Sequence, residues 1–244
     1  MSILKNFKYL DKLINSGVEE IVLDSNILLN DDEQSEYIEG IELCDDDLVI
    51  DGNGYSIDAR GKTRIFDCTG KNITIKNITL KNGFTEDNGG AIHNYENNCN
   101  IFESIFSENS AANYGGAINN YNGCCKIFKS TFNDNFAEEY GGAIYNWDDC
   151  KIEQSVFTNN IVNRNGGAIT NRKEISIVES IFNGNIAEDQ GGAVNSYEGC
   201  CRIIKSIFKS NTAEYKGGAI RNYSEAKLKH SKCKFDNNKP DDID

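Results

Sequence analysis

The sequence predicts an all-β fold, a single parallel β-helix wound as a solenoid of about nine coils of about 25 residues. Two observations predict this fold: a Gly-Gly-Ala-Ile motif returns at a nearly constant period, and a large apolar residue stands nine positions before each copy. Closely matching copies begin at Gly89, Gly115, Gly141, Gly166, Gly191 and Gly217, which are 26, 26, 25, 25 and 26 residues apart. The preceding apolar residues are Leu80, Phe106, Phe132, Phe157, Phe182 and Phe208.

Within each repeat the apolar residues alternate with polar ones, and this period of two indicates strands rather than helices. One unit of this length cannot bury an apolar face alone, so the units must stack. Like residues of successive coils should then lie about 4.8 Å apart on parallel strands, in a rod roughly 40 Å long.

The stretch before the repeats predicts a cap and entry strands. Apolar residues at helical spacing predict an amphipathic helix over residues 2–16, which would cover the first coil and end near Gly17. Strands are expected within 19–29 and 41–57, with Asp51-Gly-Asn-Gly54 as a plain turn. The predicted organisation is a capping helix at 1–18, a β-helix at 19–238 and a polar tail at 239–244.

Several rows of identical residues are expected to form internal ladders. Cysteines at or beside one repeat position predict an interior row of free thiols, because neighbours at the coil spacing are poorly placed for disulfides. Asparagines three residues after each Phe should stack their side-chain amides at a turn. The predicted ladder residues are Phe106, Phe132, Phe157, Phe182 and Phe208, and Asn109, Asn135, Asn160, Asn185 and Asn211.

Composition limits the function. A formal net charge of −13 disfavours binding to nucleic acid or to an anionic membrane surface. The chain lacks an apolar run long enough to span a bilayer, and charged residues interrupt its first segment, so no membrane insertion and no signal peptide are predicted. The sequence as written is expected in the cytoplasm, or at the cell surface or secreted if a leader has been removed. It leaves the oligomeric state open.

The recurring Gly-Gly-Ala-Ile with Phe-x-x-Asn resembles the repeats of polymorphic outer-membrane proteins and adhesin-like β-helix proteins. The stretch Leu48-Val-Ile-Asp-Gly-Asn-Gly-Tyr-Ser-Ile-Asp58 is similar to the entry coil of pectate-lyase-like β-helices. The resemblance covers residues 19–238 and implies a right-handed winding. It leaves function open, since adhesins, tailspikes and polysaccharide-active enzymes all use such coils.

Enzymatic chemistry has little support in the residues. The sequence lacks the Asn-Thr-Asp, Gly-His-Gly and Arg-Ile-Lys motifs expected of pectin-degrading hydrolases. His93 occupies an outward repeat position and is interpreted as a surface substitution, and His230 lies in the irregular last coil. No cofactor is expected, apart from a weak calcium site at Asp148 and Asp149.

A row of aromatic residues is the main candidate for ligand contact. The row directly follows a second row of asparagines, it is interrupted by Arg172, and its rings should line one edge of the rod. Its members are Tyr95, Tyr121, Trp147, Tyr197 and Tyr223. We expect a non-catalytic, adhesin-like scaffold that binds a carbohydrate or protein partner through this edge and nearby acidic turns. The alternatives are a polysaccharide lyase or hydrolase with a non-standard site, and an acidic mimic of nucleic acid.

Overall fold

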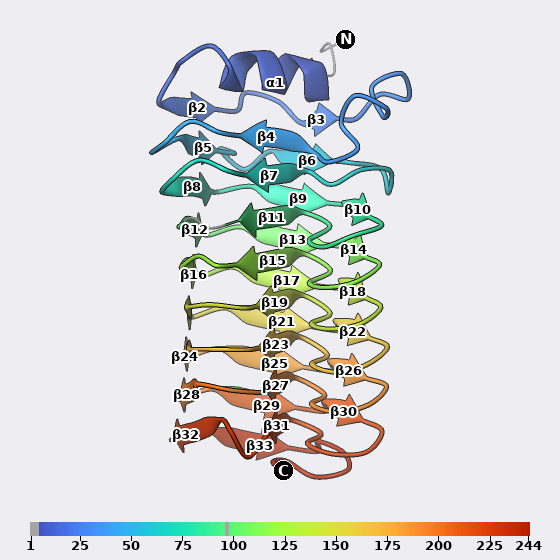
Figure 1. The fold of residues 1–244 in the computed structure, drawn as a ribbon, viewed down its shortest axis with the longest axis vertical. Helices are drawn as coiled ribbons and strands as arrows, with labels where there is room; N and C mark the ends of the chain where they lie inside the picture. The colour runs from blue at the N-terminus through green and yellow to red at the C-terminus, as the bar shows by residue number, and fades with distance from the viewer. Residues whose placement is uncertain (1–4, 96–97) are drawn as a thin grey trace.

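The computed structural model describes residues 5–95 and 98–244 and shows a right-handed parallel β-helix with one short helix over its first coils (Figure 1). Each full coil contributes one strand to each of four parallel sheets, here called A to D. The two ends of the chain lie at opposite ends of the rod (Figure 1). The fold class predicted from the repeat is confirmed.

The strands of each sheet are given in their spatial order. Sheet A contains β1 (Lys5–Asn6), β3 (Ile27–Leu28), β6 (Ser56–Asp58), β9 (Thr79–Lys81), β13 (Ile105–Ser107), β17 (Thr131–Asn133), β21 (Val156–Thr158), β25 (Ile181–Asn183), β29 (Ile207–Lys209) and β33 (Lys234–Asp236). Sheet B contains β2 (Glu20–Val22), β5 (Val49–Asp51), β8 (Ile73–Lys76), β12 (Cys99–Phe102), β16 (Cys125–Phe128), β20 (Cys150–Glu153), β24 (Ile175–Val178), β28 (Cys200–Ile204) and β32 (Lys227–Ser231).

The other two sheets complete each coil. Sheet C contains β4 (Ile41–Leu43), β7 (Phe66–Cys68), β11 (Ile92–Tyr95), β15 (Ile118–Tyr121), β19 (Ile144–Asn146), β23 (Ile169–Asn171), β27 (Val194–Ser196) and β31 (Ile220–Asn222). Sheet D contains the short strands β10 (Phe84–Thr85), β14 (Ser110–Ala111), β18 (Phe136–Ala137), β22 (Ile161–Val162), β26 (Ile186–Ala187) and β30 (Thr212–Ala213).

The cap is the helix α1 (Phe7–Ile14). Its N-cap is Asn6, whose side chain accepts a hydrogen bond from the backbone N–H of Tyr9 at 3.0 Å. Phe7, Leu10 and Ile14 are buried on the first coil, which shields apolar groups that would otherwise face water.

The helix is shorter than the predicted span of 2–16. Lys5 and Asn6 instead pair as strand β1 with β3, and the cap residue Asn15 ends the helix before Gly17. The predicted apolar positions Ile3 and Leu4 lie outside the described residues.

The interior is built from the predicted ladders. The stacked phenylalanine rings lie 4.7–4.8 Å apart with interplanar angles of 3–5° from Phe106 to Phe208. Cys99, Cys125 and Cys150 are buried in register, and all nine cysteines are free thiols. In the asparagine ladder, each Nδ2 donates to the Oδ1 of the next residue at 2.9–3.0 Å, in the series Asn109, Asn135, Asn160, Asn185, Asn211 and Asn238.

The last six residues, expected to be a polar tail, extend the final coil. Lys239 forms a parallel bridge with Thr212, and Ile243 forms one with Ile220. The backbone N–H of Ala219 donates to the carbonyl oxygen of Asp242 at 3.2 Å. Residues 239–244 therefore cover part of the last strands of sheets C and D.

Candidate functional site

The outer face of sheet C carries two parallel rows of side chains. Because side chains alternate along a strand, Ile118 and Asn120 point into the core while Asn119 and Tyr121 point outward. The first outward row, here called the inner row, is Asp67, His93, Asn119, Tyr145, Thr170, Asn195 and Arg221. The second, here called the aromatic edge, is Tyr95, Tyr121, Trp147, Arg172, Tyr197 and Tyr223.

A third row lies above the inner row and covers it. These residues stand directly before each Gly-Gly pair and are bridged to one another in parallel: Tyr114, Tyr140, Asn165, Gln190 and Lys216. We call them the overhang. Tyr114 stacks on Tyr145 with ring centroids 4.8 Å apart, and Thr170 donates its hydroxyl hydrogen to the carbonyl oxygen of Asn165 at 2.7 Å. The inner row is therefore enclosed between the sheet and the overhang.

The interpretation of His93 as a surface substitution is wrong. Its side chain is only 18% exposed, and its Nδ1 lies 3.6 Å from Oδ1 of Asp67. Burial, aided by the nearby Arg64 guanidinium, lowers the pKa of His93 to about 4 in spite of the carboxylates of Asp87 and Glu39. Burial also raises the pKa of Asp67. The imidazole is therefore neutral at pH 7. His230, by contrast, is exposed on β32.

The aromatic edge forms a stack along the rod. The rings of Tyr95 and Tyr121 lie 5.4 Å apart at 12°, and those of Tyr197 and Tyr223 lie 4.6 Å apart at 17°. Trp147 lies 5.7 Å from Tyr121 with a tilt of 37°. Since the stacking follows the coil spacing, the two rings of each stacked pair cover part of each other's face.

Arg172 continues this stack instead of interrupting it. Its guanidinium carbon lies 4.1 Å from the ring centroid of Tyr197 and 5.7 Å from that of Trp147. From the inner row, Tyr145 accepts a hydrogen bond from Nε of Arg172 at 3.2 Å, and the overhanging Tyr140 ring lies 5.9 Å away. Burial opposes the charge of Arg172, but the Tyr145 hydrogen bond raises its pKa. A planar cation replaces a ring because its flat face stacks in the same way.

Exposure divides the aromatic edge into two parts. Tyr95 and Trp147 are 46% and 36% exposed. Tyr197 is half-buried, and its hydroxyl oxygen accepts a hydrogen bond from Nδ2 of Asn165 in the overhang at 3.0 Å. Tyr223 is half-buried as well. The two exposed members therefore lie in the part of the edge from Tyr95 to Arg172, here called the accessible part, in which Tyr121 and Arg172 are half-buried.

The acidic pair Asp148 and Asp149 lies in the turn that follows Trp147. Oδ1 of Asp148 is 3.0 Å from Nζ of Lys173, so this carboxylate already has a cation partner. In the part of the chain that the structure describes, no three His, Cys, Asp or Glu side chains are grouped as a metal site. The calcium site at Asp148 and Asp149 stays a prediction.

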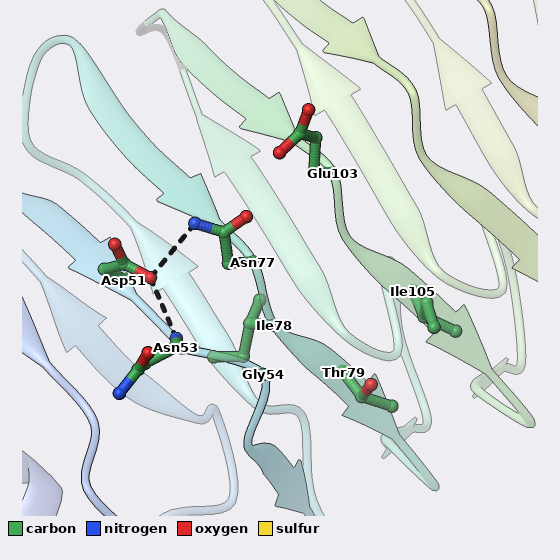
Figure 2. A pocket seen from close by; sticks show the side chains of 8 residues that line it. All are labelled: Asp51, Asn53, Gly54, Asn77, Ile78, Thr79, Glu103 and Ile105. Atoms are coloured by element: carbon green, nitrogen blue, oxygen red, sulfur yellow. Dashed lines mark hydrogen bonds between the residues drawn. The ribbon is translucent and has the colours of Figure 1, made fainter.

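A groove of about 370 Å³ lies at the corner between sheets A and B, in the first coils (Figure 2). Its carboxylate Asp51 accepts hydrogen bonds from the backbone N–H of Asn53 at 2.8 Å and from Nδ2 of Asn77 at 3.2 Å. Burial alone would raise the pKa of Asp51, but these bonds and the Lys76 ammonium hold it below its usual range. An ionised, fully engaged carboxylate is a poor general acid for glycoside cleavage.

Sequence reasoning missed the overhang and the role of Arg172. Tyr114 and Tyr140 stand at one fixed position before the Gly-Gly pair, so the period gives their row. The period does not show that the turn folds this row back onto sheet C. The stacking of Arg172 could not be predicted from the period, because Arg172 replaces an aromatic residue at that position.

Two family models match the chain. A putative pectate lyase-like adhesive domain matches residues 7–126. A Chlamydia polymorphic membrane protein repeat matches residues 129–146, 154–172 and 205–223. No curated protein and no solved structure gives a significant match. No helix among the described residues is long and apolar enough to cross a membrane. The chain is therefore a parallel β-helix repeat protein, similar to a pectate lyase-like adhesive domain in its first half and to polymorphic membrane protein repeats in its second.

Proposed function

We propose that this protein is a non-catalytic adhesive scaffold that binds a partner through the accessible part of the aromatic edge. The observation that carries the proposal is the exposure of Tyr95 and Trp147 in one continuous stack that includes Arg172. Trp, Tyr and Arg are the residue types that dominate binding hot spots. The rigid solenoid holds these side chains in a line, so little conformational entropy is lost on contact.

The stacking geometry favours a protein surface over a carbohydrate as the partner. A sugar packs its flat face on an open ring face, but in this stack the ring faces are partly covered by their neighbours. Ring rims remain, and they suit the irregular contacts of a protein interface. The matched repeat is named for a membrane protein, which supports display at a cell surface.

The test compares wild type with Tyr121→Ala and Trp147→Ala in two assays: capture of proteins from detergent extracts of surface-labelled cells, and a glycan array. The matched control is Phe84→Ala, because Phe84 has the same 36% exposure as Trp147 but lies on sheet D. We expect both edge variants to lose a captured protein that the control retains. Equal capture by all four proteins would remove the edge as the binding surface. If the edge variants differ from wild type only in binding to the glycan array, the partner is a carbohydrate.

A further inference from the structure

Arg172 is a cation without an anionic partner, whereas the two basic residues nearest to it in the sequence are both paired. Its neighbours Arg164 and Lys173 lie 3.4 Å and 3.0 Å from carboxylate oxygens of Glu139 and Asp148. Among the described residues, no carboxylate oxygen lies within 4 Å of Arg172, and its hydrogen bond to Tyr145 uses Nε. The two terminal NH₂ groups of the guanidinium are therefore available.

In these surroundings a positive charge at Arg172 is energetically unfavourable as long as it has no anionic partner. The side chain is half-buried among the rings of Tyr140, Trp147 and Tyr197. A partly dehydrated charge loses water hydrogen bonds, and ring faces replace only a part of that interaction. A carboxylate that accepts two parallel hydrogen bonds from the free NH₂ groups would restore the rest.

We propose that Arg172, which is held between Trp147 and Tyr197, anchors a carboxylate side chain of an acidic protein segment. This inference rests on the proposed function and names the chemistry of its partner. Neighbouring rings cover ring faces in this stack, and this disfavours a sugar. It favours an Asp or Glu side chain, because a carboxylate needs access only to the edge of the guanidinium. The rings on either side fix the plane of the guanidinium group, so little side-chain entropy is lost when it makes a bidentate contact.

The acidity of the chain is uneven along the rod. Residues 1–60 contain 15 Asp and Glu against 4 Lys and Arg, and so carry most of the net charge of −13. Residues 200–244 contain 10 Lys and Arg against 6 Asp and Glu. The coils around Arg172, residues 134–198, contain 11 Asp and Glu against 4 Lys and Arg, so binding of an acidic segment there depends on the short-range contact with the guanidinium and not on the overall field.

The test measures binding of a fluorescein-labelled octaglutamate peptide by fluorescence anisotropy at low and at physiological ionic strength. We expect binding to wild type and at least about a tenfold weaker affinity for Arg172→Gln, because one charge-assisted contact is lost. Arg172→Lys should lie between the two, since it keeps the charge and loses the fork. The control Arg202→Gln removes one positive charge from β28 on sheet B and should bind like wild type.

Thermal unfolding of each variant checks folding, and Arg172→Lys carries the test if Arg172→Gln does not fold. Equal affinity of wild type and Arg172→Gln, or equal binding of octaglutamine, would overturn the inference. Arg172-dependent binding of a sulfated oligosaccharide without binding of octaglutamate would assign the site to glycans instead. If Trp147→Ala loses its captured protein while Arg172→Gln keeps it, the proposed function stands and the carboxylate anchor does not.

Discussion

The Oδ1 atom of Asn160 accepts two hydrogen bonds from Asn135, one from the backbone N–H at 3.1 Å and one from Nδ2 at 2.9 Å. Nδ2 of Asn160 in turn donates to the carbonyl oxygen of Phe132 at 3.0 Å. Both asparagines are buried, so water cannot replace these bonds. One amide thus satisfies two backbone groups of the preceding coil at the turn where the strand ladder is broken.

We predict that Asn160→Ala destabilises the protein by roughly 2 to 4 kcal/mol, because several buried donors and acceptors lose their partners at once. Urea unfolding followed by far-UV circular dichroism measures the change. The control Asn163→Ala removes an exposed amide from the next turn and should stay within about 0.5 kcal/mol of wild type. Equal midpoints for the two variants would show that the ladder contributes nothing to stability.

The phenylalanine stack makes a second prediction. Phe157 is fully buried and stacks on Phe132 and Phe182, with centroids 4.8 Å away on both sides. Phe157→Ala should cost about 3–5 kcal/mol, because it leaves a cavity that the rigid neighbouring coils cannot close. Phe157→Leu should cost less, since Leu80 fills this position on β9.

The same urea experiment applies, with Phe128→Ala as the control. Phe128 lies on the outer face of β16 and is only half-buried, so its loss should cost clearly less. If Phe157→Ala and Phe128→Ala had the same effect, the internal stack would not be the main source of cohesion between coils.

These ladders could be predicted because each joins identical repeat positions. Phe106 and Phe132 share one place in the repeat, so stacking the coils brings them into register without further information. The same reasoning gives the contact between Asn109 and Asn135. The repeat period therefore predicts which residues of the two adjacent coils lie next to each residue along the rod.

The period does not fix contacts between different positions of the repeat. Tyr114 meets Tyr145 only because the turn before the Gly-Gly pair folds back over sheet C. That folding depends on backbone geometry at the corner, which residue spacing does not reveal. His93 was misplaced for a similar reason: alternation correctly predicts that it points away from the core, but not that it lies beside Asp67 with a side chain only 18% exposed.

The corner geometry can be tested at two glycines. A Cβ on Gly142 would lie 2.2 Å from the carbonyl oxygen of Gly167 and 2.6 Å from that of Ile161, both backbone atoms that cannot move aside. Gly142→Ala should therefore destabilise the protein by about 3 kcal/mol or more. Differential scanning calorimetry should show a lower unfolding temperature.

Gly184 is the matched control, because it also occupies a corner but a Cβ there would meet only the side-chain Oδ1 of Asn159, at 2.9 Å, which can move aside. Its φ is +66°, and Asn159 has a φ of 54° at the same repeat position, so this conformation accepts a side chain. Gly184→Asn should change stability by less than about 1 kcal/mol, since asparagine adopts this conformation readily. An equal loss in both variants would mean that backbone conformation, and not close approach of the coils, requires glycine in the Gly-Gly motif.

The enclosed imidazole of His93 predicts a dependence of stability on pH. The folded-state pKa is about 4 against an ordinary value of 6.5, so between these pH values the unfolded chain binds the proton more readily. Stability should therefore fall as the pH decreases from about 6.5 to about 4, by at most about 3 kcal/mol. Asp67, whose folded pKa is raised, takes up a proton in the folded state and offsets part of this loss.

The measurement is the urea midpoint of wild type and His93→Asn from pH 7.5 to pH 4. Asparagine is the natural residue of this row at Asn119 and Asn195, so the substitution should fit. Arg64, Asp67 and the nearby carboxylates are present in both proteins, and their titration cancels in the difference. His93→Asn should lose less stability on acidification than wild type, while His230→Asn, which alters an exposed histidine, should follow wild type. Parallel curves for wild type and His93→Asn would show that the imidazole is solvated and not enclosed in the fold.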